Sequence, residues 1–155
     1  MASIEEQLVV SGIVLPDPIT PIGNYASAVR WGQLLFLSGH ISRREGKPVL
    51  GRFGDNLTYE QGYELARLVA LDLLSTIQEN IGSLDGVSHI IKLTGMVNST
   101  PTFIQQAAVI NGASDFLVGL WGDNGKHTRS AFSVAALPLG AALEIELVCA
   151  LKDGI

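Results

Sequence analysis

Residues 129–150, RSAFSVAALPLGAALEIELVCA, decide the fold of this chain. They contain two short apolar runs, residues 131–136 and residues 143–150, on either side of Leu137-Pro138-Leu139-Gly140. Proline has no amide hydrogen to donate and glycine frees the backbone, so this tetrapeptide breaks regular structure. The stretch therefore predicts two β-strands around a turn, with Arg129 just ahead of the first strand.

The second apolar run alternates with a period of two, and successive side chains of a strand point to opposite faces. One face of this strand is apolar and carries Leu143, Ile145, Leu147 and Cys149. The other face carries two acids, Glu144 and Glu146, followed by Val148 and Ala150. Cys149 is the single cysteine. We expect a buried, unreactive thiol there, because it lies on the apolar face and has no partner for an internal disulfide.

Length and composition favour one compact domain spanning residues 1–155, with 47% hydrophobic and 16% charged residues. The first residues lack a basic region followed by an apolar run, and no apolar stretch has membrane-spanning length. We therefore expect a cytoplasmic protein with no membrane partner. The net charge of −5 makes nucleic acid an unfavoured partner, because a polyanion would be repelled on average.

The N-terminal half predicts a short helix, a hairpin and a loop. Ser3 with Glu6 fits a capping box for a helix that ends near Val10. Residues 25–31 and 34–38 have strand-like patterns on either side of a Gly32-Gln33 turn, which predicts a β-hairpin. Residues 39–56 are rich in glycine and charge, so we expect a polar loop with Arg43 and Arg44 in solvent.

Two longer helices are predicted with a strand between them. Thr58 and Gln61 form a capping box for a helix that ends near Gly82 and has one apolar stripe. Residues 88–97 predict a strand, and Thr100 with Pro101 predicts the start of a second helix that runs to about Leu120. Right-handed crossovers would place both helices on one face of the sheet. The apolar run Leu34–Leu37 favours cover on the second face too, by another subunit or by a curled sheet.

Several motifs together resemble those of the YjgF-type reactive-intermediate deaminases, the Rid family, which is also called endoribonuclease L-PSP. The C-terminal signature is Arg-Ser, a strand, Leu-Pro-x-Gly and a Glu-Ile-Glu strand. Residues 21–25 are similar to the family's Ile-Gly-Pro-Tyr segment, and residues 37–41 to its Ser-Gly-Gln strand end. Asn111 falls near the family's helical asparagine. The resemblance covers about residues 21–150 and implies an α+β, chorismate-mutase-like fold, with two long helices on one sheet face and a homotrimer with pockets between subunits.

The resemblance implies hydrolysis of small 2-imino or enamine carboxylates to 2-oxo acids and ammonia, with no metal and no organic cofactor. Arg129 would hold the substrate carboxylate, since a guanidinium offers a planar fork of donors. Its structural alternative is an ion pair with Glu144 or Glu146. Glu144 would position and deprotonate the attacking water. Its alternative is a solvated or interface glutamate beside Glu146.

The resemblance further implies that Tyr25, Ser38, Gly39, Asn111 and Ala131 bind the substrate. Each also has a plainer interpretation. Tyr25 is an isolated aromatic that packing would explain, Ser38-Gly39 suits a turn at a strand end, and Asn111 could face water. Ala131 stands where typical members have cysteine, a position that acts mainly through its backbone carbonyl.

Other departures from the family pattern indicate a divergent, longer branch. His40 replaces the glutamine after Ser-Gly, Asn24 replaces the proline before the tyrosine, and extra residues occur near the N-terminus. Another extra segment, Trp121 to His127, precedes Arg129, and its two aromatic side chains could line a widened pocket.

Two other functions stay open. The first is a non-catalytic trimer that binds or senses a small 2-oxo acid. The second is an endoribonuclease that uses His40 and His127 as acid and base. The three histidines have no metal-ligand spacing, so a metal site is not expected.

Overall fold

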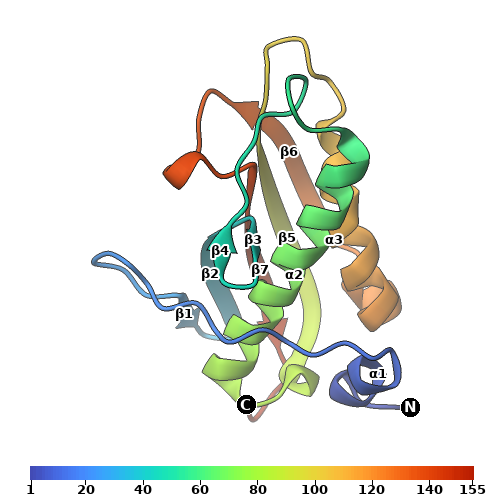
Figure 1. The fold of residues 1–155 in the computed structure, drawn as a ribbon. Coiled ribbons are helices and arrows are strands. Elements are labelled where there is room, and N and C mark those ends of the chain that lie inside the picture. Colours follow the sequence, from blue (N-terminus) through green and yellow to red (C-terminus); the bar gives the residue numbers. More distant parts are fainter.

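The computed structural model describes residues 1–155 as a curved sheet with two long helices packed on one face (Figure 1). The sheet has five strands in the order β1-β2-β7-β5-β6. Their bounds are β1 Ala28–Trp31, β2 Leu34–Ile41, β5 Val87–Asn98, β6 Thr128–Val134 and β7 Leu143–Leu151. The helices are α1 Ile4–Val10, α2 Tyr59–Ile81 and α3 Gln106–Trp121. The α+β class, with both long helices on one face, is confirmed.

The two strands of the 129–150 stretch are not neighbours in the sheet. β5 lies between them, parallel to β6 and antiparallel to β7. The turn Pro138–Gly140 therefore carries the chain across the end of β5. β6 also begins at Thr128, three residues before the predicted start, so Arg129 lies within the strand. Its register then determines which face Arg129 occupies.

Both predicted capping boxes are confirmed. The Ser3 hydroxyl accepts from the Glu6 amide at the start of α1, and the Thr58 hydroxyl accepts from the Gln61 amide at the start of α2. Gly82 ends α2 with a positive φ of 85°, a conformation that glycine adopts without a Cβ clash. None of the helices combines the length and the apolar character that crossing a membrane requires.

The predicted start of the second long helix is wrong. α3 begins at Gln106, and Thr100 does not cap it. The Thr100 amide instead donates to the carbonyl of Phe53 at 2.9 Å, which keeps the chain extended there. A turn follows, closed by the Phe103 amide on the Thr100 carbonyl at 3.2 Å. A contact with a distant segment thus replaces the local capping preference.

The prediction of a polar loop over residues 39–56 is also wrong in part. β2 continues to Ile41, and a small hairpin follows, made of β3 Arg43–Arg44 and β4 Lys47–Pro48. Arg43 is not free in solvent, because its Nη2 lies 2.8 Å from a carboxylate oxygen of the buried Asp72 on α2. Arg44 is exposed as expected. The ion pair ties this hairpin to α2.

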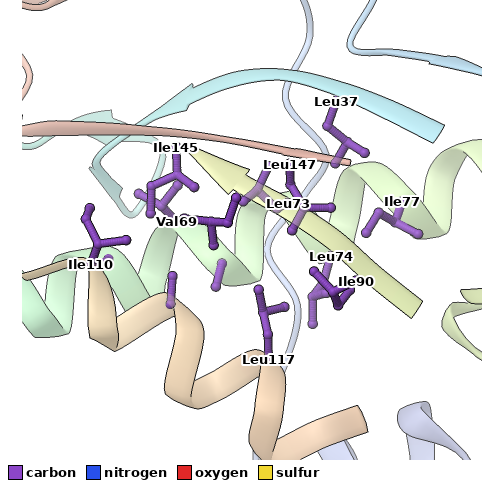
Figure 2. Close-up of a cluster of buried hydrophobic side chains, with 14 of the residues drawn as sticks. Leu37, Val69, Leu73, Leu74, Ile77, Ile90, Ile110, Leu117, Ile145 and Leu147 are labelled. Atoms are coloured by element: carbon purple, nitrogen blue, oxygen red, sulfur yellow. The ribbon is translucent and has the colours of Figure 1, made fainter. Parts of the chain in front are cut away.

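The core lies between the sheet and the two long helices (Figure 2). It is a continuous cluster of 27 buried apolar residues. The alternation predicted for β7 is confirmed, because Leu143, Ile145, Leu147 and Cys149 are all at most 1% exposed. Burial raises the pKa of the Cys149 thiol to about 12, which keeps it protonated and unreactive.

The second face of the sheet is uncovered within the chain. Leu35 and Leu37 of β2 point into the core, whereas Phe36 between them is 44% exposed. Phe132 of β6 lies on the same open face and is 43% exposed. Neither a helix nor a curled edge of the sheet covers these side chains. We call this surface, with Phe36, Phe132 and Glu146, the open face.

Gly112 sets how closely α2 and α3 can pack. A Cβ at this position would collide with the backbone carbonyl of Tyr63 on α2, which is not free to move away. We expect Gly112→Ala to lower the free energy of unfolding by about 1–3 kcal/mol, the usual range for overpacking. Chemical denaturation followed by circular dichroism measures this change.

Gly119 provides the matched control on the same helix. Nothing lies within 4 Å of a Cβ built there, so Gly119→Ala gains helix propensity, about 1 kcal/mol, without a clash. Equal effects of the two alanine variants on the unfolding free energy would contradict the role assigned to Gly112.

Candidate functional site

Arg129 is held by two neutral side chains of α3. Its Nη1 donates to Oδ1 of Asn111 at 2.7 Å and to Oγ of Ser114 at 3.1 Å. Its Nε and Nη2 donate to no group within the chain, and no carboxylate lies within ion-pair distance of it. The alternative of an ion pair with Glu144 or Glu146 is therefore not formed within one chain.

This arrangement leaves one edge of the guanidinium available. The two Nη1 hydrogens are used by Asn111 and Ser114, so the Nε hydrogen and the Nη2 hydrogens stay unpaired. Nε and Nη2 together form a fork that fits the two oxygens of a carboxylate. Asn111 lies beside this guanidinium, and its side-chain amide nitrogen donates to no group within the chain. Ala131 lies two residues beyond Arg129 on the same face of β6 and packs against the core.

Glu144 lies in a separate hollow of about 350 Å³ at the other side of the sheet. The hollow is bounded by Tyr25, the end of β2 from Gly39 to Ile41, and the turn that contains Leu139. Its apolar walls are Ile19, Ile22, Ile41, Pro48, Pro138 and Leu139. It is thus a largely apolar cavity with one carboxylate, one phenol and the paired Arg43 at its rim.

The carboxylate of Glu144 lies directly over Gly39. A Cβ at position 39 would collide with Oε1 of Glu144, so glycine is the residue that admits this side chain. Burial, and then the neighbouring charge of Glu146, raise the pKa of the Glu144 carboxyl above its usual range. A carboxylate with a raised pKa in a half-buried position is suited to general-base work near neutral pH.

Ser38 and His40 stabilise this end of β2 by hydrogen bonds to other groups of the same chain. The Ser38 hydroxyl donates to the Ala26 carbonyl at 2.7 Å, and its amide donates to the Ser27 carbonyl at 2.9 Å. Both Ser38 donors are therefore used, which leaves its hydroxyl oxygen as an acceptor for a ligand. His40 is 3% exposed, with Nδ1 at 2.7 Å from the Ser38 carbonyl.

The second ring nitrogen of His40 lies 2.8 Å from the Thr76 hydroxyl of α2. Burial lowers the pKa of the His40 imidazole. Because a carbonyl only accepts, Nδ1 carries the hydrogen and the neutral ring accepts at Nε2. His40 is thus a structural support of the bulge between Leu37 and His40, where β2 departs from regular pairing with β7.

The residues predicted for one site fall into two groups in the chain. Tyr25, Gly39 and Glu144 line the hollow, whereas Ser38 precedes Gly39 on β2 and does not line it. Asn111 of α3 lies beside Arg129 of the opposite edge strand, β6, which also carries Ala131. The register explains the division, because Arg129 lies opposite Leu93 on the helix-covered face, whereas Glu144 lies opposite Met96 on the open face.

Sequence reasoning missed Ser114 and misplaced the extra segment before Arg129. Trp121 packs against the core at the end of α3, and His127 hydrogen-bonds Ser114, so neither lines the hollow. Leu139 was also missed. It adopts a left-handed φ of 58° and is 64% exposed beside the hollow, a combination that often marks a functional site. No three or more His, Cys, Asp or Glu side chains converge as metal ligands would.

Comparison with known proteins places most of this chain in one family. A family model described as "YjgF/chorismate mutase-like, putative endoribonuclease" matches residues 5–151. Protein TCP17 of Trypanosoma cruzi is 40% identical over 144 residues, which cover 92% of this chain and 90% of that protein.

Two solved structures superpose on nearly the whole chain. A protein of Shewanella oneidensis MR-1, described as a "putative endoribonuclease", has a TM-score of 0.93 at 28% identity, with 97% of this chain and 100% of that chain covered. Atu1372 of Agrobacterium tumefaciens, a protein of unknown function, has a TM-score of 0.88 at 33% identity, with 97% and 94% covered.

Proposed function

The chain belongs to the YjgF/chorismate-mutase-like family, and from this premise we propose that it hydrolyses small 2-imino or enamine carboxylates to 2-oxo acids and ammonia. The observation that carries the proposal is the guanidinium of Arg129. Its Nη1 is bound by neutral groups, and its Nε and Nη2 edge is left unpaired for a carboxylate.

The proposed site is shared between two copies of the chain. Within one copy, Arg129 and Glu144 are on opposite faces and two strands apart, about 10 Å sideways at the usual strand spacing. A head-to-tail interface brings one edge of each copy to the opposite side of the next, and it forms a ring when its rotation closes. We propose a ring of three copies, with the apolar side chains of the open face buried inside it.

The chemistry follows from the two groups. Arg129 of one copy binds the substrate carboxylate and fixes C2 of the imine opposite Glu144 of the next copy. An enamine first gains a proton at its carbon terminus and loses one from nitrogen, which gives the imine. Glu144 takes a proton from a water molecule whose oxygen attacks C2, while the C=N electron pair moves to nitrogen. The proton then passes to nitrogen, which gives a carbinolamine.

The second half of the reaction uses the same carboxylate. Glu144 removes the hydroxyl proton of the carbinolamine, the C–O double bond forms, and the C–N bond breaks. Glu144 passes this hydroxyl proton to nitrogen, so that ammonia leaves and a 2-oxo acid remains. The apolar walls of the hollow favour a substrate with a small apolar side chain.

The decisive assay generates 2-aminoacrylate in situ from serine with a lyase and follows pyruvate release in the presence of semicarbazide. We expect this protein to divert the intermediate from semicarbazone to pyruvate. Equal rates with and without the protein, across several amino-acid precursors, would end the proposal for this substrate class.

Mixing two impaired variants tests the shared site. Arg129→Ala lacks the carboxylate fork and Glu144→Gln lacks the base, so each alone is expected to keep at most about a tenth of the wild-type activity. When the two are unfolded together and reassembled in equal amounts, a shared site regains both groups at about a quarter of the interfaces, and activity returns in that proportion. A mixture as inactive as its components would show that each site lies within one copy.

Ribonuclease chemistry by His40 and His127 has less support. The ring of His40 is buried and both of its nitrogens are hydrogen-bonded within the chain. Both nitrogens of His127 are also used, by Ser114 and Gly125, in a different part of the fold. Neither ring is available to a phosphate, and the net charge of −5 opposes RNA binding.

A further inference from the structure

The second partner of Arg129 begins a chain of hydrogen bonds that leads away from the site. Arg129 Nη1 lies 3.1 Å from Ser114 Oγ, and Ser114 Oγ lies 2.9 Å from His127 Nε2. The other ring nitrogen, Nδ1, lies 2.7 Å from the carbonyl oxygen of Gly125. The four groups form one continuous line from the guanidinium to the backbone of the segment before β6.

The groups at the two ends of this line restrict the directions of its hydrogens. The Gly125 carbonyl only accepts, so His127 Nδ1 carries a hydrogen, and in the tautomer with its single hydrogen there Nε2 accepts. Arginine only donates, so the Ser114 oxygen accepts from Arg129. The Ser114 hydroxyl hydrogen is then directed to His127. Ser114 cannot turn this hydrogen toward Arg129, which keeps its oxygen facing the guanidinium.

The far end of the line is anchored independently of Arg129. Gly125 is buried at the end of the short turn Gly122–Gly125, which follows α3 directly. A Cβ at position 125 would lie 2.5 Å from the Leu117 carbonyl oxygen, so this turn packs against the backbone of α3. His127 therefore rests on rigid backbone rather than on the substrate-binding residues.

Ser114 and Asn111 hold the guanidinium together. They are three residues apart on α3, so their side chains lie on the same side of that helix. Asn111 alone would leave Arg129 free to swing about one hydrogen bond. Two acceptors on one nitrogen set the plane of the guanidinium and the direction of its free edge, and a preorganised fork loses less freedom when it binds a carboxylate.

We propose that Ser114 and His127 are positioning residues for Arg129, and that the extra segment Trp121–His127 sets the carboxylate affinity of this protein through them. The proposal rests on the proposed function, in which Arg129 binds the substrate carboxylate. Ser114 and His127 themselves do not touch the substrate.

The test measures binding of 2-oxobutanoate by calorimetry, together with the kinetics of imine hydrolysis, on the assembled full-length protein. Ser114→Ala and His127→Phe each interrupt the line. We expect each to weaken 2-oxobutanoate binding and raise KM about three- to tenfold, the range for one ordinary hydrogen bond, because each acts on the carboxylate only by positioning Arg129, while kcat changes less. Ser114→Thr keeps the hydroxyl and His127→Gln keeps an acceptor, so both should bind nearly as wild type does.

Double variants separate positioning from a general structural effect. Ser114→Ala combined with His127→Phe should weaken binding no more than Ser114→Ala alone, because both act through one line. In the Arg129→Ala background, Ser114→Ala should have no further effect.

Unchanged affinity in folded Ser114→Ala or His127→Phe, with affinity lost in Arg129→Ala, would overturn this inference alone. Unchanged affinity in Arg129→Ala as well would overturn the proposed function. If Ser114→Ala fails to fold, the positioning role is tested by comparing the 2-oxobutanoate affinity of His127→Phe with that of His127→Gln.

Discussion

Arg129→Ala is expected to lower kcat/KM and the affinity for small carboxylates about ten- to a hundredfold, while the protein stays folded and assembled. The size corresponds to the net loss of one charge-assisted hydrogen bond, about 1.5–3 kcal/mol. The fold should survive because Arg129 pairs only with the neutral side chains of Asn111 and Ser114, so its removal leaves no buried charge behind.

Arg129→Lys should lose almost as much activity as Arg129→Ala. A lysine keeps the positive charge, but its ammonium cannot present two parallel hydrogens to a carboxylate while it also reaches Asn111 and Ser114. Arg44→Ala is the matched control, since Arg44 is an exposed arginine that does not line the hollow. It removes the same charge and should leave affinity unchanged.

Binding, assembly and melting temperature should be measured on the same Arg129→Ala sample. A normal mass and melting temperature with weak binding supports the assigned role. A broken oligomer or a much lower melting temperature would instead mean that Arg129 serves the interface between copies. A folded protein that binds carboxylates as tightly as wild type would remove Arg129 from the site.

Local signals predicted the elements that depend on nearby residues. The alternation of Leu143, Ile145 and Leu147 gave the buried face of β7, and the two capping boxes gave the starts of α1 and α2. In each case the hydrogen bond or the burial involves residues within a few positions in the chain. Such patterns are visible without knowledge of the rest of the fold.

Long-range contacts explain the errors. Thr100 has a capping residue's chemistry, but its amide is used by Phe53, which is 47 positions away, so α3 starts later. Arg43 looks like a solvated loop arginine, but α2 places Asp72 beside it. Neither partner is indicated by the residues next to it in the sequence.

The division of the site has the same origin. Motif resemblance proposed site residues but could not predict their faces, because β5 lies between β6 and β7 and its pairing fixes the register of Arg129. The predicted strand started after Arg129, so no alternation was applied to it. Ser114 has no sequence signal of its own, since only the fold places it between Arg129 and His127.

Glu144→Gln is expected to lower kcat by about a hundredfold to ten-thousandfold, the usual contribution of a general base, with carboxylate affinity nearly unchanged. Glutamine has the shape of glutamate and fits over Gly39, but it cannot accept the proton of the attacking water. Single-turnover kinetics and 2-oxobutanoate binding on the same sample separate chemistry from binding. Retained turnover would exclude Glu144 as the base. If wild type and variant bind carboxylates equally and neither turns over an imine, the protein is a binding module.

The pH dependence gives an independent test of the same residue. Burial, followed by the charge of Glu146, raises the pKa of Glu144, and a general base must be ionised. Activity should therefore fall as the pH drops through this raised pKa, above the range of an ordinary glutamate. Glu146→Gln removes the like charge, lowers the pKa of Glu144 and should move the acidic limb of kcat/KM to lower pH. The limb should stay above the ordinary range, because burial is the larger cause.

The stability of the protein should depend on pH with the opposite sign to its activity. A carboxyl whose pKa is raised in the folded state favours folding when protonated, so its contribution is present below the unfolded pKa and is lost as the pH rises through the folded pKa. Glu144→Gln removes the ionised form and should therefore raise the melting temperature at neutral pH but not in acid. A base kept at a cost in stability is expected of a catalytic residue. The comparison is the difference in melting temperature between Glu144→Gln and wild type. If the variant is inactive but this difference is no larger at neutral pH than in acid, the result would contradict the half-buried, unpaired carboxylate on which the proposed mechanism depends.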